Sequence, residues 1–423
     1  MGNKLKSGNV HLVRQMNRSA ILQLIRENGP VSRVSLARLT HLTPATAFSI
    51  VEELVDLGLV QEDGIGSSAG GRKPKLFKFN PNAFAAVGVD LRANRLVAVI
   101  TDLDARPLAK IVHTYQGEID GAEGARLIHE ATQEVIRVSG MPAEALVGLG
   151  ISVPGMIDAA NGMVVKAVNL GWEQVPLRPL LREQLNLPIH ILDVSAALAI
   201  GETHFGAGKG ARNLICINVG SGIGSGIVIG EQLYWGADGV AGEIGHMTVD
   251  EDGPLCRCGN YGCLERLAAG PAIVERAIKG LKQGAASSIR TLVRDKLEDV
   301  TVETVVKAAR SGDDFARSIL NETGRYLGMG IANVVNFLNP EIVIVGGGVA
   351  ETAGETLLEP LRQAVKLRAF EVHARRVRIV PAKLGLEASA IGDATWAMIN
   401  AGLLTPQPGV SVEVNESYAV DVI

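Results

Sequence analysis

The chain has 423 residues, of which 47% are hydrophobic and 20% are charged, so it can bury large cores and is too long for one small domain. Its 49 glycines cluster at the ends of Val/Ile runs instead of repeating at a fixed period, which argues against a collagen-like or low-complexity chain. No apolar run reaches the roughly 18 residues needed to cross a bilayer, and the N-terminus has no apolar signal segment. We expect a soluble cytoplasmic protein of two or three globular domains.

Charge is distributed unevenly along the chain. Residues 1–80 carry 11 Lys and Arg against 6 Asp and Glu, a net charge of +5, whereas the remainder carries 30 basic and 39 acidic residues, a net charge of −9. A small basic head on a larger acidic body predicts a polyanionic partner for the head alone.

Two helices are predicted at the start of the chain. Apolar residues at helical spacing predict a first helix that stops at Gly29-Pro30, a pair that ends helices. A second, short helix is predicted over residues 35–40, and we expect Leu36, Ala37 and Leu39 to face inward. Its cap is a serine, either Ser32 or Ser35.

A third helix is predicted after the turn at His41, a position that usually favours a left-handed conformation. Thr43 can cap this helix, and Pro44 suits its first position. The residues predicted to form its buried face are Ala47, Ile50, Val51, Leu54 and Leu57.

These helices, a Gly/Ser loop and the alternating run 75–79 indicate a winged helix-turn-helix over residues 1–80. We expect the third helix to face the major groove and the loop 70–74 to form the wing. The alternative is a packing module whose Lys and Arg are merely solvated. The residues predicted to contact double-stranded DNA are Thr43, Ala45, Thr46, Ser49, Arg72 and Lys73.

From residue 85 onward, Val/Ile strands with intervening helices predict an α/β body over residues 85–405. Strands are predicted at 87–91, 96–101, 146–152, 214–218, 226–229 and 342–345, and helices at 121–140, 303–311 and 314–338. Glycine-rich turns at 220–226 and 346–348 follow strands. Such turns can cradle phosphate or approach a sugar ring closely, although a purely structural turn is at least as good an explanation for either one.

The most specific signal is a cluster of metal-binding residue types in the run GHMTVDEDGPLCRCGNYGCLE. His246, Cys256, Cys258 and Cys263 offer one imidazole and three thiolates to a tetrahedral zinc ion. Such a site has no open coordination position, so we expect structural zinc that pins the loop 246–263. The alternative is a set of incidental buried cysteines. The fourth cysteine, Cys216, lies in a strand run and is predicted to be core.

Three further motifs accompany the winged helix-turn-helix: Gly150-Ile-Ser-Val-Pro154-Gly155, Glu243-Ile-Gly-His246, and Cys256-x-Cys258-Gly-x-x-Gly-Cys263-x-Glu265. Together these motifs resemble the ROK family (repressors, open reading frames and sugar kinases), in particular its repressor branch. The resemblance implies a two-lobed, actin-like sugar-kinase fold behind the head, with a sugar held between the lobes. The sugar-binding residues that it implies are Asn169, Asp193, Glu243, His246 and Glu265.

The chain departs from the family's kinases at two places. Those kinases carry an Asp-x-Gly-Gly-Thr loop for the ATP phosphates, whereas the loop here is Asp90-Leu-Arg-Ala-Asn-Arg95. Their catalytic aspartate lies eight residues before a helical glutamate, but Asp193 precedes Glu202 by nine. Either the helix has an insertion, or Val194 stands at the position of the base. Loss of a general base alone costs about 10² to 10⁴ in rate, so we expect a sensor and not a catalyst.

The first hypothesis is therefore a sugar-responsive transcription regulator, a repressor of carbohydrate-metabolism genes, that binds operator DNA as a homodimer or homotetramer. The second is an ATP-dependent sugar kinase with a regulatory DNA-binding head, in which Asp193 is the base. The third is a constitutive DNA-binding protein with a vestigial body. The sequence leaves open which sugar binds, whether the sugar is phosphorylated, and whether it releases the protein from DNA.

Overall fold

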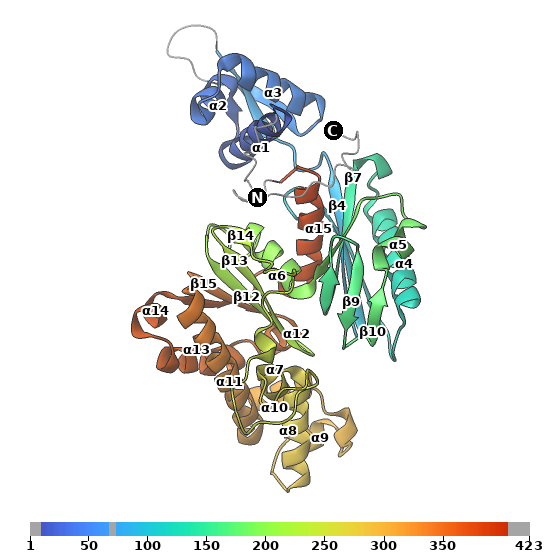
Figure 1. Ribbon diagram of the computed structural model, residues 1–423, viewed down its shortest axis with the longest axis vertical. Coiled ribbons are helices and arrows are strands. Elements are labelled where there is room, and N and C mark those ends of the chain that lie inside the picture. Colours follow the sequence, from blue (N-terminus) through green and yellow to red (C-terminus); the bar gives the residue numbers. More distant parts are fainter. Residues whose placement is uncertain (1–9, 67–72, 405–423) are drawn as a thin grey trace, which may run out of the picture.

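The computed structural model describes residues 10–66 and 73–404, so the predicted wing residues Gly70, Gly71 and Arg72 lie outside the described residues. It places a small head at one end of a body with two lobes (Figure 1). The fold class predicted from the sequence is confirmed. No helix within the described ranges is long and apolar enough to span a membrane.

The head is a three-helix unit with a three-stranded sheet of order β1-β3-β2. Its elements are α1 (Val10–Asn28), β1 (Val31–Ser32), α2 (Arg33–Thr40), α3 (Pro44–Asp56), β2 (Val60–Ile65) and β3 (Lys75–Phe79). Ser32 caps α2 and Thr43 caps α3, each accepting a backbone N–H at 3.2 Å, and His41 between the helices has the left-handed conformation. The expectation that Leu39 faces inward is wrong: its side chain is 48% exposed, because α1, α3 and the sheet pack against the face of α2 that carries Leu36 and Ala37.

Lobe 1 is built on a five-stranded sheet of order β11-β7-β4-β5-β6. Its strands are β4 (Ala85–Arg92), β5 (Arg95–Asp102), β6 (Pro107–Thr114), β7 (Leu146–Val153) and β11 (Ile189–Asp193). Beside them lie α4 (Gly121–Ser139), a 3-10 turn (Ala143–Ala145), α5 (Leu177–Arg182) and a small sheet of β8 (Met156–Asp158), β9 (Met163–Ala167) and β10 (Trp172–Val175). The predicted loop Asp90–Arg95 is mostly strand, because Arg92 pairs with Arg95 and leaves only two turn residues.

Lobe 2 repeats the topology of lobe 1. Its sheet has the order β14-β13-β12-β15-β16, and its strands are β12 (Leu214–Val219), β13 (Ile223–Ile229), β14 (Gln232–Leu233), β15 (Ile342–Gly346) and β16 (Arg378–Pro381). In both sheets three consecutive strands are antiparallel, and two later strands add in parallel beside the first of them. This duplicated topology is that of the two-lobed fold expected from the sequence.

The outer helices of lobe 2 pack on the face of this sheet that points away from lobe 1, and the core of lobe 2 lies between the helices and the sheet (Figure 1). They are α7 (Leu264–Ala268), α8 (Gly270–Lys282), α9 (Ile289–Leu292), α10 (Val302–Arg310), α11 (Asp314–Leu338), α12 (Gly348–Ala353), α13 (Glu355–Arg368) and α14 (Glu371–Arg376). Three 3-10 turns accompany them, at Ile244–His246, Leu297–Asp299 and Gly385–Glu387.

Two central helices lie between the sheets, α6 (Val194–His204) and α15 (Ala388–Asn400) (Figure 1). Helix α15 packs on the lobe 1 sheet, α6 packs on the lobe 2 sheet, and the two helices pack on each other. Their backbones touch, since a Cβ atom on Gly392 would collide with the Ala197 carbonyl oxygen. The predicted turn at 220–226 is shorter than expected, because β13 begins at Ile223 and Gly226 is a strand residue pressed against Ser195 of α6.

Candidate functional site

A large crevice of about 4190 Å³ runs between the lobes and continues beneath the head. It is lined by side chains from positions 14 to 402 of the sequence. The residues predicted to bind sugar all line it: Asn169, Asp193, Glu243, His246 and Glu265. The part of the crevice lined by α1, which includes Arg14, Met16 and Arg18, was not predicted. No sequence signal marks it, because Met16 belongs to the apolar pattern of the first helix and only the structure shows that it is 64% exposed.

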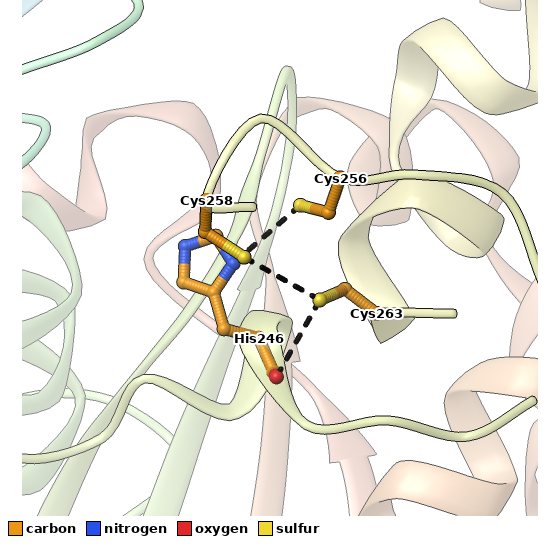
Figure 2. A group of neighbouring side chains, drawn as sticks. All are labelled: His246, Cys256, Cys258 and Cys263. Carbon is orange, nitrogen blue, oxygen red and sulfur yellow. Dashed lines mark hydrogen bonds between the residues drawn. The ribbon is translucent and has the colours of Figure 1, made fainter. Parts of the chain in front are cut away.

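The four predicted metal ligands form one cluster. The ligand atoms of His246, Cys256, Cys258 and Cys263 all lie within 4.8 Å of one another, and their sulfur atoms and ring face a common point (Figure 2). Cys258 Sγ lies 3.6 Å from Cys263 Sγ, and Cys256 Sγ lies 3.7 Å from His246 Nδ1. Ligands around a tetrahedral zinc ion are separated by about 3.7 Å, so the donor set and its spacing fit this metal. The cluster could therefore hold a metal ion.

His246 connects this cluster to the crevice. Its Nδ1 faces the cysteines, while its Nε2 points the other way and lies 4.0 Å from Glu243 Oε2. Burial raises the pKa of Glu243, and the carboxylates of Asp193 and Glu265 act in the same direction. The crevice therefore gathers three carboxyl groups and one imidazole nitrogen. These groups can accept hydrogen bonds from vicinal hydroxyls, and the imidazole can also donate one.

Two of these carboxyl groups are held by backbone N–H groups. Glu265 Oε2 accepts the N–H of Ile223, at the start of β13, at 2.9 Å. Asp193 ends β11 and caps α6, accepting the N–H groups of Ser195 and Ala196 at 2.7 and 3.3 Å. Val194, the other position considered for a kinase base, is only 2% exposed. Asp193 is thus the group that the cap presents to the crevice.

An arginine at the end of β4 extends from lobe 1 toward lobe 2. Arg92 Nε lies 2.8 Å from Asp90 Oδ1, and its Nη2 donates to Ser389 Oγ at 3.3 Å. Nη1 approaches the turn at Gly220 in lobe 2. Arg92 therefore reaches from β4 of lobe 1 toward the first turn of lobe 2 and occupies space between them.

The predicted DNA-contacting residues of α3 share one exposed face. Thr43, Ala45, Thr46 and Ser49 are all exposed, opposite the buried Ala47, Ile50, Val51 and Leu54. The Thr43 and Thr46 hydroxyls are 2.8 Å apart, so both take part in the helix cap. Lys73 is exposed next to Pro74, whose carbonyl accepts the Gly66 N–H at 2.8 Å and closes the base of the loop.

Comparison with known families agrees with this architecture. The sequence profile of the ROK family matches residues 86–399, about three quarters of the chain. The chain belongs to the ROK family. A second profile, that of winged helix-turn-helix DNA-binding domains, matches residues 17–61. The chain thus combines an N-terminal winged helix-turn-helix domain with a ROK domain.

Individual ROK proteins resemble the chain over most of its length. The xylose repressor of Caldicellulosiruptor bescii is 33% identical over 385 residues, which cover 91% of this chain and 96% of that protein. The crystal structure of a ROK family transcriptional regulator, a homolog of the E. coli MLC protein, covers 92% of this chain and 98% of that one, with a TM-score of 0.79 and 26% identity. A ROK family glucokinase from Streptomyces griseus, in complex with glucose and AMPPNP, covers 74% of this chain and 98% of that one, with a TM-score of 0.67 and 31% identity.

Proposed function

We propose that this protein is a sugar-responsive transcription repressor whose two-lobed body senses the sugar and whose head binds operator DNA. The observation that carries this proposal is one continuous crevice, which is lined by the predicted sugar-binding residues at one end and by α1 of the head at the other. Similarity to a repressor over nearly the whole chain supports it. Because regulation requires access to chromosomal DNA, we expect the protein in the cytoplasm. We place the boundary between the head and the body between residues 80 and 85.

The sugar would lie between Glu243, Glu265 and Asp193, with Asn169 and His246 Nε2 completing the ring of polar groups. Carboxylates accept hydrogen bonds from vicinal hydroxyls, and an imidazole whose Nδ1 binds a metal has a fixed orientation. Zinc is the ion that the three cysteines and His246 fit best. Its role would be structural, since the four protein ligands leave no open position for substrate.

The body would sense sugar without phosphorylating it. Arg92 and its partner Asp90 support this proposal, because the guanidinium stands where the kinases keep glycines for phosphate. The rival hypothesis is a sugar kinase in which Asp193 acts as the general base. An ATP-turnover assay with D-xylose and D-glucose decides between them: phosphorylation at ordinary enzyme rates, on the order of 10 s⁻¹, would overturn the sensor.

A repressor of this type would act as a homodimer or homotetramer, because paired heads read paired half-sites. Three strongly exposed apolar side chains on neighbouring helix ends of lobe 2 support this proposal. Phe337, Leu367 and Phe370 are 87%, 81% and 65% exposed, and the Phe370 N–H donates to Asn336 at the end of α11. A second copy of the chain would remove these side chains from water.

The function is tested by fluorescence anisotropy of the full chain on the DNA upstream of its own gene, at fixed salt. The sugars are D-xylose, D-glucose and D-glucose 6-phosphate. We expect one of them to change operator affinity at least tenfold, equivalent to about 1.4 kcal/mol of coupling. Specific binding that no sugar alters would favour a constitutive DNA-binding protein. Failure to bind DNA specifically would favour the kinase.

A further inference from the structure

Arg26, in the last turn of α1, joins the head to lobe 1. Its Nε donates to Asp104 Oδ1 at 3.1 Å, and its Nη2 donates to the Leu103 carbonyl oxygen at 2.7 Å. Asp104 and Leu103 lie in the turn between β5 and β6. The Arg26 side chain is only 18% exposed, so water screens this ion pair less than it would a surface pair.

The same guanidinium also contacts the end of a central helix. It lies 5.3 Å from the ring centroid of Phe205 and 5.2 Å from that of Phe79, both within the range of cation–π attraction. Phe79 belongs to the head, but Phe205 is the C-terminal cap residue of α6. Arg26 therefore connects the head to α6 as well as to lobe 1.

Helix α6 is attached to lobe 2 at both ends. At its N-terminal end Ser195 packs against Gly226 of β13, the strand whose first N–H donates to Glu265. At its C-terminal end the buried Glu202 accepts the N–H groups of Lys383 and Leu384, just after β16, at 2.9 and 2.8 Å. The helix also follows β11 of lobe 1 directly in the chain and packs on α15, which lies on the lobe 1 sheet, so the position of Phe205 depends on both lobes.

The helix also reaches the predicted sugar site. Asp193, its N-terminal cap, lines the crevice, and the 11 residues of α6 span about 16 Å from there to Phe205. All residues from Val194 to Thr203 are buried, so the helix transmits displacement as a rigid body. A displacement of α6 relative to the lobe 1 sheet would therefore change the distance between Asp104 and Phe205, the two residues between which Arg26 lies.

We propose that Arg26 is a positioning residue that sets the orientation of the DNA-binding head according to the position of α6. This inference rests on the proposed function and names its route of regulation. Sugar bound beside Asp193, the cap of α6, favours one position of this helix. Arg26 can keep its contacts with Asp104 and Phe205 only by moving α1. The shift in operator affinity cannot exceed the difference in sugar affinity between the two arrangements.

The test compares Arg26→Met with Arg33→Met in the full chain. Methionine keeps the apolar stem of arginine but removes the donors and the charge. Arg33 is a matched control, since it pairs with Glu52 at 3.2 Å and lies 4.8 Å from the Phe77 ring centroid, both inside the head. For each variant we measure operator affinity with and without D-xylose, D-glucose or D-glucose 6-phosphate, and sugar affinity by calorimetry without DNA.

We expect the wild type and Arg33→Met to respond at least tenfold to the active sugar. Arg26→Met should respond less than about twofold, although it still binds both operator and sugar. Phe205→Leu removes the aromatic ring that Arg26 contacts but leaves the Arg26–Asp104 pair intact, and we expect it to lose the sugar response as well. This second variant tests the inference if Arg26→Met does not fold.

Two outcomes overturn the inference. One is a folded Arg26→Met or Phe205→Leu protein with the full wild-type response. The other is loss of sugar binding together with the response, which a purely structural role would produce. A wild-type protein whose operator binding is indifferent to all the sugars would overturn the proposed function itself, and with it the premise of this inference.

Discussion

Arg92 and Asp90, two residues apart at the end of β4, form a buried ion pair in which Arg92 Nε lies 2.8 and 2.9 Å from the two carboxylate oxygens. Asp90 has no exposed surface, and the Arg92 side chain is 21% exposed. The pair lies beside a second buried carboxyl group, Asp393, whose pKa burial raises well above its usual value. Arg92 is therefore the cation that balances a group of acids, which are Asp90, Asp193 and Asp393.

Removing Arg92 should destabilise the protein. Arg92→Ala leaves the Asp90 carboxylate buried without its partner, so we expect the free energy of unfolding to fall by about 3 kcal/mol in urea titrations. Arg126→Ala, which breaks solvent-exposed pairs on α4, should hardly change the midpoint. Equal losses in the two variants would contradict the role assigned to burial.

Metal removal should destabilise the 246–263 loop. We expect one zinc ion per chain by elemental analysis, and a chelator or Cys263→Ser should release it and lower Tm. Cys216→Ala is the matched control, because Cys216 is fully buried in β12, away from the cluster, and its loss should leave the metal content unchanged. A wild-type chain that retains no metal after purification in zinc-containing buffer would refute the site.

Stability should decrease as the pH falls from about 6.5 towards 4. Burial, with the nearby Arg26 as a second cause, lowers the pKa of His204 to about 4, and burial does the same for His190. Between these values the unfolded chain binds a proton that the folded chain does not, so the free energy of unfolding falls with the pH.

Replacing His204 should remove part of this pH dependence. We expect the loss of unfolding free energy between pH 6.5 and 5 to be smaller by about 2 kcal/mol in His204→Gln than in the wild type. His190→Gln should act in the same direction. Urea titrations at the two pH values measure the difference, and identical losses in variant and wild type would show that the imidazole titrates normally.

The loop of the head should contribute to DNA binding through phosphate contact alone. Lys73→Ala should weaken specific and non-specific binding by similar factors and reduce the slope of log K against log salt by about 0.9. Lys110→Ala is the control, since Lys110 lies on β6 of the body and pairs with Glu387 at 2.5 Å. If Lys73→Ala changed sequence preference instead, the lysine would be reading bases.

The exposed apolar side chains of lobe 2 should hold two copies of the chain together. The double variant Phe337→Glu/Leu367→Glu should shift the protein from dimer or tetramer to a smaller species in sedimentation velocity, because charge is costly in a dry interface. Leu386→Glu alters a residue that is 44% exposed elsewhere on the body and should leave the mass unchanged. An unaltered mass in the double variant would place the interface on another surface.

The sequence by itself determined the features that depend on residues close together in the chain. The cap at Thr43 with Pro44 after it starts α3 as expected, since capping involves only the first turn of a helix. The His/Cys cluster is equally local: its four residues lie within 18 positions, and their types and spacing already predict a group that could hold a metal ion. The family motifs around Glu243 and Glu265 similarly predicted which side chains would meet in the crevice.

Only the tertiary structure decided relationships between distant residues. Periodicity identifies an apolar face but not what covers it, which is why Leu39 was expected to be buried and is exposed. Counting positions left Asp193 and Val194 as alternatives; only the end of β11 and the cap of α6 show that both lie at the wall of the crevice and that the Val194 side chain is buried. The contact between Arg26 and Asp104 spans 78 positions, so no local pattern encodes it; it exists because the head packs where the two lobes meet.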